Sequence, residues 1–434
     1  MEQIDLRYAE LKGKIKDEKL SPDPRNPGKF LKERRENNGI KYLNPENWVF
    51  HKDVVEKVLK GKYDEIRPYS AEFVSTLNCS NRCDICAYKC PKMSEFVWLR
   101  NNFSDPQVHM QDLGFAKSLL DKLIDGGIKG VIFTGGGEPF LFTKLEELVA
   151  HATEKGADSV VYTNGNCVSE RRIRRLIEAK PLLVRVSLNC GTKQVYNEFH
   201  NPLSTKNSFE RTLLTIESLA EGSIKNPRMS VGVGVVITNA NQDDLVESAK
   251  RIKEIIDRTG GGIEFIAYRP AFEYYDKGQL NPEFLQKTCS TVENEVKLVL
   301  QGTGVKVSNI TCRYEALMHD TRTYTICRGT GLYAELGPNG NLYFCCDRNL
   351  NRRCEIGSLL QDSLIDIHTG KQREEFLAYI NKNKCTPCPP ACKSHELNKQ
   401  FQKIEDLRAA GELYKAELWV EELQKQTPPK MVNF

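Results

Sequence analysis

Three cysteines near the start of the chain have the residue type and spacing to bind iron. Cys79, Cys83 and Cys86 are separated by three and then by two residues. Thiolates at this spacing can bind three irons of a cubane cluster from one short loop, which leaves the fourth iron without a protein ligand. An iron with an open position can coordinate an exogenous molecule, so the loop predicts chemistry as well as electron storage. A zinc site is the alternative for these three cysteines taken alone.

A glycine-rich turn follows the next expected strand. The apolar segment 131–133 ends in Thr134, and the turn that follows contains Gly135, Gly136, Gly137 and Glu138. Glycines let the backbone approach a ligand closely, and a glutamate places an acceptor beside a cationic group. By itself this segment could be an ordinary turn. Its position one βα unit after the three cysteines favours a binding site.

Together the two motifs resemble those of the radical S-adenosylmethionine (SAM) superfamily, over roughly residues 70 to 270. In that family the amino and carboxylate groups of SAM chelate the open iron of a [4Fe–4S] cluster. One electron then cleaves a C–S bond and yields a 5′-deoxyadenosyl radical, which takes a hydrogen atom from an unactivated carbon. The resemblance also implies a flavodoxin or ferredoxin as the electron donor.

The resemblance extends to residues of a SAM pocket at the ends of the expected strands. Gly136 to Glu138 match the turn that binds the methionine amino group, and Ser187 and Asn189, at the end of one further strand, match contacts to the ribose or carboxylate. Asn164 ends the neighbouring strand, and we expect it to face the same pocket. Ile237 and Tyr268 match neighbours of the adenine, although ordinary barrel packing is an equal alternative for these two.

A second group of cysteines lies in the last quarter of the chain. Cys327 and Cys345 flank Gly340, and Cys385, Cys388 and Cys392 follow. This pattern resembles the auxiliary-cluster extension called SPASM, or its shorter form, twitch. It implies one auxiliary [4Fe–4S] cluster bound by the first two cysteines and by two of the last three. The twitch pattern favours Cys385 and Cys388 as those two; a four-cysteine zinc site is the alternative.

The auxiliary cluster and two further thiols have possible roles in the reaction. A cluster with four thiolates would move electrons during substrate oxidation or peptide cross-linking, or would be structural. Cys190 follows the strand end at Ser187, and Cys346 adjoins a cluster ligand. Either thiol could donate a hydrogen atom to a substrate radical, against the simpler reading of a buried thiol.

Composition restricts the remaining possibilities. The chain has 434 residues, a net charge of +4 and fifteen cysteines, and its longest apolar run is far too short to span a bilayer. We therefore expect a cytoplasmic protein without a membrane partner, in which clustered cysteines bind metal rather than form disulfides. The mild charge gives no reason to expect nucleic acid.

The elements that must position these motifs follow from hydrophobic periodicity. Apolar strands alternate with amphipathic helices from residue 71 onward, which predicts an α/β fold with a partial (β/α)6 TIM-like barrel and functional loops at the strand C-termini. We expect a mostly helical N-terminal extension at 1–68, the barrel at 69–300, a small cysteine-rich α+β domain at 301–395 and a helical tail at 396–434. The expected strands are 72–77, 130–133, 159–162, 183–188, 229–237 and 263–267.

Two classes of substrate are compatible with these motifs. One is a polar small molecule of the aminoglycoside, sugar or nucleotide type, and the other is a ribosomally made peptide that is cross-linked or epimerised. Residues 1–68 lack the strand alternation of a leader-peptide-binding domain, so the small molecule is favoured. A non-catalytic electron-transfer protein with two clusters is the third alternative.

Overall fold

The computed structural model describes most of the chain between residues 46 and 426. The expected N-terminal extension lies outside the described residues from 1 to 45. The described residues are 46–86, 88, 102–204, 206–271, 282–309, 321–348, 351–385, 388–389 and 391–426.

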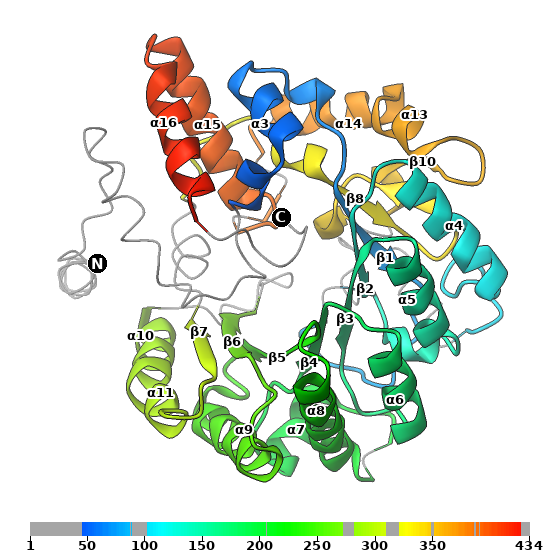
Figure 1. Cartoon of the computed structure of the whole chain (residues 1–434), viewed down its shortest axis with the longest axis vertical. Coiled ribbons are helices and arrows are strands. Elements are labelled where there is room, and N and C mark those ends of the chain that lie inside the picture. Colours follow the sequence, from blue (N-terminus) through cyan, green and yellow to red (C-terminus); the bar gives the residue numbers. More distant parts are fainter. Residues whose placement is uncertain are drawn as a thin grey trace.

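A single sheet of ten strands forms the centre of the molecule (Figure 1). Its order is β10-β9-β8-β1-β2-β3-β4-β5-β6-β7, and neighbours from β8 through β1 to β7 all pair in parallel. The bounds are β1 Ser70–Val74, β2 Gly130–Thr134, β3 Asp158–Thr163, β4 Leu183–Ser187, β5 Ser230–Ile237, β6 Phe265–Pro270, β7 Lys306–Asn309, β8 Tyr333–Leu336, β9 Asn341–Tyr343 and β10 Glu355–Ser358.

Helices cover the outer face of the curved sheet (Figure 1). Each parallel connection needs a crossover, and the helices supply it on one side only, as in a barrel. Asp112 begins the first of them by accepting a hydrogen bond from the backbone N–H of Phe115 at 2.8 Å. They are α4 Leu113–Asp125, α5 Leu145–Glu154, α6 Glu170–Glu178, α7 Lys193–His200, α8 Ser208–Lys225, α9 Leu245–Thr259, α10 Pro282–Thr291 and α11 Lys297–Val299.

The expected α/β fold with a mainly parallel sheet is confirmed, and the strand count differs. All six expected strands are present, and β7 adds a seventh parallel strand beside β6. Its four residues, Lys306–Asn309, are too short and too polar to produce a strand signal. The sequence pattern places these residues in the C-terminal region instead.

The C-terminal cysteine-rich region joins the sheet of the barrel. The expected hairpin forms β8 and β9, and β8 pairs in parallel with β1. Helices α13 Leu364–His368 and α14 Lys371–Lys382 follow β10.

The two ends of the described chain pack together. Helices α15 His395–Ala409 and α16 Leu413–Gln424 lie beside the short helices η1 Asn47–Phe50 and α3 Lys52–Leu59 (Figure 1). Trp48 lies in this cluster and donates its indole N–H to Gln400 Oε1 at 2.7 Å. In the described part of the chain, no helix is long and apolar enough to cross a membrane.

The two faces of the sheet have different roles. Alternate residues of each strand, such as Phe73 and Phe133, pack against the helices. The opposite alternation points to the inner face, where Ile132, Val160 and Leu183 form an apolar layer. Glu72 is in register with this layer, so its carboxylate lies on the inner face.

Candidate active site

The three-cysteine loop directly follows β1, as expected for a functional loop at a strand C-terminus. A segment at the end of α7 runs along this loop. Its His200 carbonyl accepts a hydrogen bond from the Arg82 N–H at 3.0 Å, and Leu203 N–H donates to the Ser80 carbonyl at 2.9 Å. These backbone contacts fix the loop between Cys79 and Cys83.

The side chain of His200 contacts the middle cysteine. Its Nδ1 lies 3.3 Å from Cys83 Sγ and 3.2 Å from Asn81 Nδ2. Its Nε2 lies 3.3 Å from both the Leu188 carbonyl and Asn189 Nδ2. Burial lowers the pKa of His200 to about 4, so the imidazole is neutral at ordinary pH.

A network of amides holds the other end of the loop. Asn166 accepts from Ser80 Oγ and donates to Asn81 Oδ1, both at 2.6 Å. Asn164 Nδ2 donates to Ser80 Oγ at 3.0 Å and lies 3.8 Å from Cys79 Sγ. The structure therefore brings the predicted Asn164 beside the cysteine loop.

Glu138 is a buried connector between neighbouring strand ends. Its carboxylate accepts hydrogen bonds from Thr163 Oγ1 at 2.6 Å, from the Asn164 N–H at 2.7 Å and from the Phe140 N–H at 3.1 Å. Burial raises the pKa of Glu138, while these donors act in the opposite direction. Since Glu138 is 2% exposed and fully engaged by protein groups, its role in the turn is to hold the backbone in place.

The glycine turn touches the backbone just before the first cysteine. Glu138 N–H donates to the Asn78 carbonyl at 2.8 Å. A Cβ added to Gly137 would lie 2.1 Å from that same carbonyl oxygen, so only glycine fits here. The two predicted motifs are thus in direct contact.

The remaining predicted SAM-pocket residues divide into two groups. Ser187 lies on the inner face at the end of β4, and Asn189 follows it with a left-handed φ of 61° and accepts from the Val236 N–H at 2.8 Å. Ile237 and Tyr268 belong instead to the core under the helices, where the Tyr268 hydroxyl meets Ser248 Oγ of α9 at 3.0 Å. This placement favours the packing alternative for both.

The loop offers a donor set that suits an iron-sulfur cluster. Three thiols project from eight residues, and thiolate is the ligand that such clusters prefer. Asn78, next to Cys79, is 0% exposed, and neither atom of its side-chain amide has a hydrogen-bond partner among the described residues. A buried amide without a partner is costly, so this one fits a site completed by a further polar group.

The C-terminal cysteines also come together. Burial raises the pKa of Cys345, and negative charge on Asp347, Cys388, Cys327 and Cys392 would raise it further. Cys385 lies in the same group, since charge on Cys327 and Cys388 raises its pKa in addition to burial.

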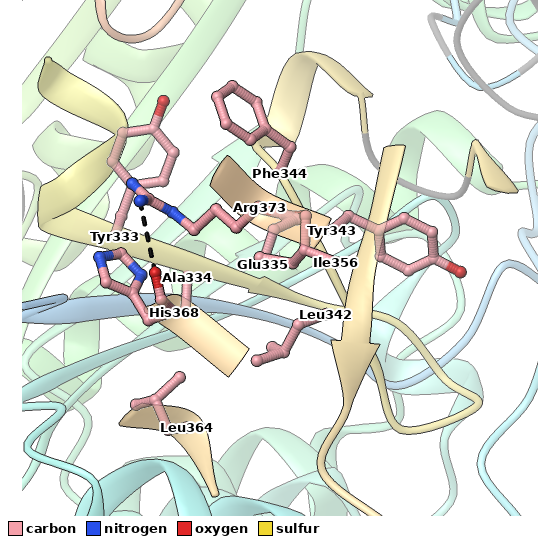
Figure 2. Close-up of a pocket in the computed structure, with 10 residues that line it drawn as sticks. All are labelled: Tyr333, Ala334, Glu335, Leu342, Tyr343, Phe344, Ile356, Leu364, His368 and Arg373. Atoms are coloured by element: carbon pink, nitrogen blue, oxygen red, sulfur yellow. Dashed lines mark hydrogen bonds between the residues drawn. The ribbon is translucent and has the colours of Figure 1, made fainter. Parts of the chain in front are cut away.

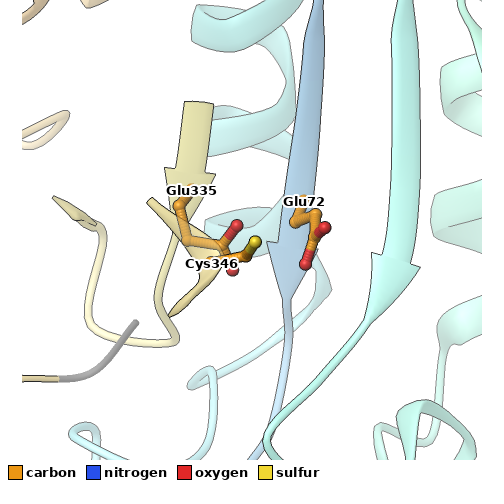
Figure 3. Close-up of side chains that lie close together, drawn as sticks. All are labelled: Glu72, Glu335 and Cys346. Atoms are coloured by element: carbon orange, nitrogen blue, oxygen red, sulfur yellow. The ribbon is translucent and has the colours of Figure 1, made fainter. Parts of the chain in front are cut away.

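The two thiols considered as hydrogen donors differ in their surroundings. Cys190 is 0% exposed and lies in the core under the helices, where burial raises its pKa and negative charge on Asp244 and Cys83 would raise it further. Cys346 instead lies close to the carboxylates of Glu72 and Glu335, with the sulfur and one oxygen of each within 4.8 Å of one another (Figure 3). Only Cys346 therefore adjoins polar groups of the inner face.

Lys393 completes this group of side chains. Its Nζ donates to Glu72 Oε1 at 2.7 Å and lies 4.5 Å from the centroid of the Tyr333 ring. Its backbone N–H donates to Asp347 Oδ2 at 3.1 Å. Lys393 thus ties the last cysteine segment to β1.

A small pocket, which Glu335 also lines, lies between the C-terminal strands and helices α13 and α14 (Figure 2). Arg373 crosses it, with its guanidinium 6.0 Å from the Phe344 ring centroid, and donates to the His368 carbonyl at 3.4 Å. Burial lowers the pKa of Arg373 to about 10. None of the predicted cysteine ligands or SAM-pocket residues lines this pocket.

Sequence reasoning missed three residues of the site: His200, Asn166 and Lys393. Each reaches its partner through the fold, and no local motif marks it. Asn166 carried the best available signal, because it follows a strand end only two residues after the predicted Asn164.

Two regions of the chain match known families. Residues 73–252 match the radical SAM superfamily, and residues 327–393 match the iron-sulfur cluster-binding domain SPASM. The first region contains the three-cysteine loop and the glycine turn. The second contains all five cysteines of the C-terminal group.

The chain is also similar to individual proteins. It is 28% identical over 168 residues to the Fe-coproporphyrin III synthase of Methanosarcina barkeri, covering 39% of this chain and 38% of the relative. It is 23% identical over 235 residues to the dTDP-4-amino-4,6-dideoxy-D-glucose ammonia-lyase of Streptomyces venezuelae, covering 53% and 46%. The matches thus span less than half the length of either relative.

Two solved structures share the fold. SuiB of Streptococcus suis bound to its precursor peptide SuiA has a TM-score of 0.56 at 15% identity, over 79% of this chain and 75% of that one. The structure of anSMEcpe with bound AdoMet has a TM-score of 0.51 at 17% identity, over 75% and 88%. These family matches imply SAM, a [4Fe–4S] cluster and an auxiliary cluster region. The chain belongs to the radical SAM superfamily and has a C-terminal SPASM iron-sulfur cluster-binding domain.

Proposed function

We propose that this enzyme removes a carbon-bound hydrogen atom from a polar small molecule held on the inner face of the sheet. Cys79, Cys83 and Cys86 would hold the SAM-binding [4Fe–4S] cluster. When bound and reduced, that cluster supplies the electron that cleaves SAM to a 5′-deoxyadenosyl radical. The protein's own residues then have three tasks: to hold SAM, to hold the substrate and to exclude water.

Holding SAM falls to the strand ends beside the cysteine loop. The backbone of Gly135 to Gly137 can lie against the methionine end, because no Cβ intervenes. Glu138 keeps that backbone fixed through its three accepted hydrogen bonds. We assign Asn164, Ser187 and Asn189 to the polar groups of SAM, and Ile237 and Tyr268 to packing.

The charged inner face carries the proposal for the substrate. Glu72 and Glu335 are direct neighbours in the parallel pair of β1 and β8, and Cys346 adjoins them (Figure 3). Lys393 donates a hydrogen bond to Glu72. Buried charges are costly unless they are paired or used. Such a wall suits a molecule rich in hydroxyl or amino groups.

A cation and an aromatic ring lie on another part of the same face. Tyr162 and Arg185 are neighbours in the parallel pair of β3 and β4, and the guanidinium lies 3.7 Å from the Tyr162 ring centroid. The inner face therefore presents carboxylates on one side and a guanidinium on another. This arrangement would orient a substrate that carries several polar groups.

The positions of the two cysteine groups also support a substrate site on the inner face of the sheet. The three-cysteine loop follows the C-terminal end of β1. Cys345 and Cys346 follow β9, which runs antiparallel to β8, so they lie toward the opposite end of the strands. Glu72, in the middle of β1, lies between the two groups.

We assign one auxiliary [4Fe–4S] cluster to the C-terminal cysteines. Its ligands would be Cys327, Cys345, Cys388 and Cys392, because the last two are the neighbours whose charge acts on Cys345. Cys385, which lies beside Cys327 and Cys388 in the same group, is the remaining candidate for this cluster. With four thiolates this cluster would accept or supply an electron rather than bind substrate.

A ribosomally made peptide is the second candidate substrate. The fold it shares with SuiB, which was solved with a precursor peptide, is the observation in its favour. The inner-face charges favour the small molecule. A dTDP-amino sugar is the substrate named for one relative, and it belongs to the favoured class.

The proposal is tested in two steps with anaerobically reconstituted protein. First, the reduced enzyme should convert SAM to 5′-deoxyadenosine, and a variant with Cys79, Cys83 and Cys86 all replaced by Ala should not. Second, amino sugars, aminocyclitols and nucleotide sugars should raise the rate of 5′-deoxyadenosine formation and acquire a new mass. If only peptides raise this rate and acquire a new mass, the small-molecule proposal is wrong. If the intact enzyme cleaves no SAM, the proposed radical reaction is wrong.

A further inference from the structure

The buried side chain of His200 contacts a predicted ligand of the SAM-binding cluster, and the proposed reaction has so far given it no role. It ends α7, is 2% exposed, and contacts Cys83 Sγ at 3.3 Å through Nδ1. Its own carbonyl holds the Arg82 N–H at 3.0 Å. Main chain and side chain of one residue thus both fix the loop at Cys83.

The partners of His200 are compatible with either neutral tautomer. In a neutral imidazole one nitrogen carries hydrogen and the other accepts. With hydrogen on Nε2, the ring donates to the Leu188 carbonyl, and Nδ1 accepts from Asn81 Nδ2 or from a Cys83 thiol. With hydrogen on Nδ1, the ring donates to a Cys83 thiolate, and Nε2 accepts from Asn189 Nδ2.

Only the second arrangement suits a Cys83 that binds iron. A ligating cysteine is a thiolate, which accepts hydrogen bonds and has no hydrogen to give. Two lone pairs facing each other at 3.3 Å would be repulsive, whereas an Nδ1–H directed at the sulfur is attractive. Asn189 supports this tautomer, because its Oδ1 accepts from the Val236 N–H at 2.8 Å and its amide nitrogen therefore faces Nε2. The Leu188 carbonyl and the Asn81 amide nitrogen favour the other tautomer, so the thiolate of an iron-binding Cys83 is what selects Nδ1–H.

We propose that His200 is a positioning residue which donates an Nδ1–H hydrogen bond to the Cys83 sulfur and thereby raises the reduction potential of the SAM-binding cluster. Reduction adds negative charge to the cluster, so a donor aimed at a ligand sulfur stabilises the reduced form more than the oxidised form. The inference rests on the proposed binding of that cluster by Cys83. It concerns the potential alone and requires no SAM cleavage.

Two substitutions of His200 distinguish the roles of its two ring nitrogen atoms. The amide of asparagine can take the place of Nδ1, and the amide of glutamine can take the place of Nε2. His200→Asn therefore keeps a donor for Cys83, and His200→Gln removes it. His151, which pairs with Asp121 in the outer helix layer at 2.7 Å, provides the control His151→Gln.

The experiment is a reductive titration of reconstituted protein followed by electron paramagnetic resonance, without SAM. We expect His200→Gln to weaken the one-electron reduction of the SAM-binding cluster by up to about tenfold, which equals 59 mV to lower potential. His200→Asn and His151→Gln should retain the wild-type potential. The auxiliary cluster should not shift in any variant, and iron content shows that both clusters are present.

A measurement on the unsubstituted protein covers the case in which a variant fails to fold or to bind iron. With 15N-labelled histidine, the reduced SAM-binding cluster should show a weak nitrogen hyperfine coupling that is lost in His200→Asn. An unchanged potential in His200→Gln with full iron content, or no coupling in the labelled protein, would overturn the inference while leaving the proposed function intact. Failure of the intact protein to form a cluster at Cys83 would overturn both.

Discussion

Gly137→Ala should disable SAM cleavage through a steric effect of known size. The new Cβ would lie 2.1 Å from the Asn78 carbonyl oxygen and 2.5 Å from the Leu77 carbonyl carbon, whereas ordinary contact begins at 3.4 Å. The two backbone segments must therefore separate by about 1.3 Å. Both are main chain, so no side-chain rotation can relieve the contact.

The consequences for stability and for chemistry differ in size. Overpacking of this kind costs on the order of 1–3 kcal/mol of unfolding free energy, which an enzyme of this length can survive. A misplacement of about 1 Å between reacting groups costs on the order of 100-fold in rate. Since Asn78 precedes Cys79, the shift falls directly between the cysteine loop and the glycine turn.

The assay is the rate of 5′-deoxyadenosine formation per reconstituted cluster, measured together with thermal unfolding. Gly331→Ala is the matched control, because Gly331 is buried while Gly137 is only partly buried, and yet its Cβ would meet Ile66 at 3.5 Å, an ordinary contact. We expect the control to keep the wild-type rate. A Gly137→Ala enzyme that folds and cleaves SAM at the wild-type rate would refute the steric argument.

Three further substitutions test other parts of the site. In Glu138→Gln, an amide N–H would face groups that now donate hydrogen bonds to the carboxylate. The substitution should therefore lower the unfolding free energy by about 1–3 kcal/mol, measured by denaturant unfolding. Cys392→Ala should lose the iron of the auxiliary cluster and Cys385→Ala should keep it, measured as iron per chain. Cys346→Ala should reduce substrate turnover without reducing SAM cleavage, and Cys190→Ala should change neither, measured by mass spectrometry of both products.

Each of these has a result that contradicts it. Wild-type stability of Glu138→Gln would mean that the carboxylate is protonated or that its contacts are not needed. Loss of auxiliary iron in Cys385→Ala alone would restore the pairing of Cys385 with Cys388 that the twitch pattern favours. Full turnover in Cys346→Ala would remove that thiol as a hydrogen donor.

The sequence was most informative where the chemistry is local. Cys79 to Cys86 and the turn at Gly137 are each a short segment after an apolar strand, so spacing alone indicates both motifs. Strand alternation also bears on the placement of Tyr268 and Ile237. In β6, Phe265 points to the inner layer, so Tyr268, three residues later, must point to the helices, where the structure has it. The same parity places Ile237 in that outer layer.

Contacts between distant segments could not be predicted. Cys83 and His200 are 117 residues apart, and Glu72 and Lys393 are 321 apart. No periodicity links such pairs, because the pairing of β8 with β1 depends on the whole sheet. The hairpin after Cys327 was expected as part of a separate small domain, and nothing in its few residues indicates that it continues the barrel sheet.

Because β8 pairs with β1, the two cysteine groups are attached to one continuous sheet. Strand β1 leads into the three-cysteine loop at one end. In the middle of β1, Glu72 accepts a hydrogen bond from the ammonium group of Lys393, the residue that follows Cys392. A buried ion pair adds little stability by itself, but removing one partner leaves an uncompensated charge that costs several kcal/mol. The pair therefore fixes the spacing between the two groups more than it stabilises the fold. A substrate bound between the two cysteine groups would contact this same ion pair. Lys393 would then affect both the position of the substrate and the position of the auxiliary cluster relative to it.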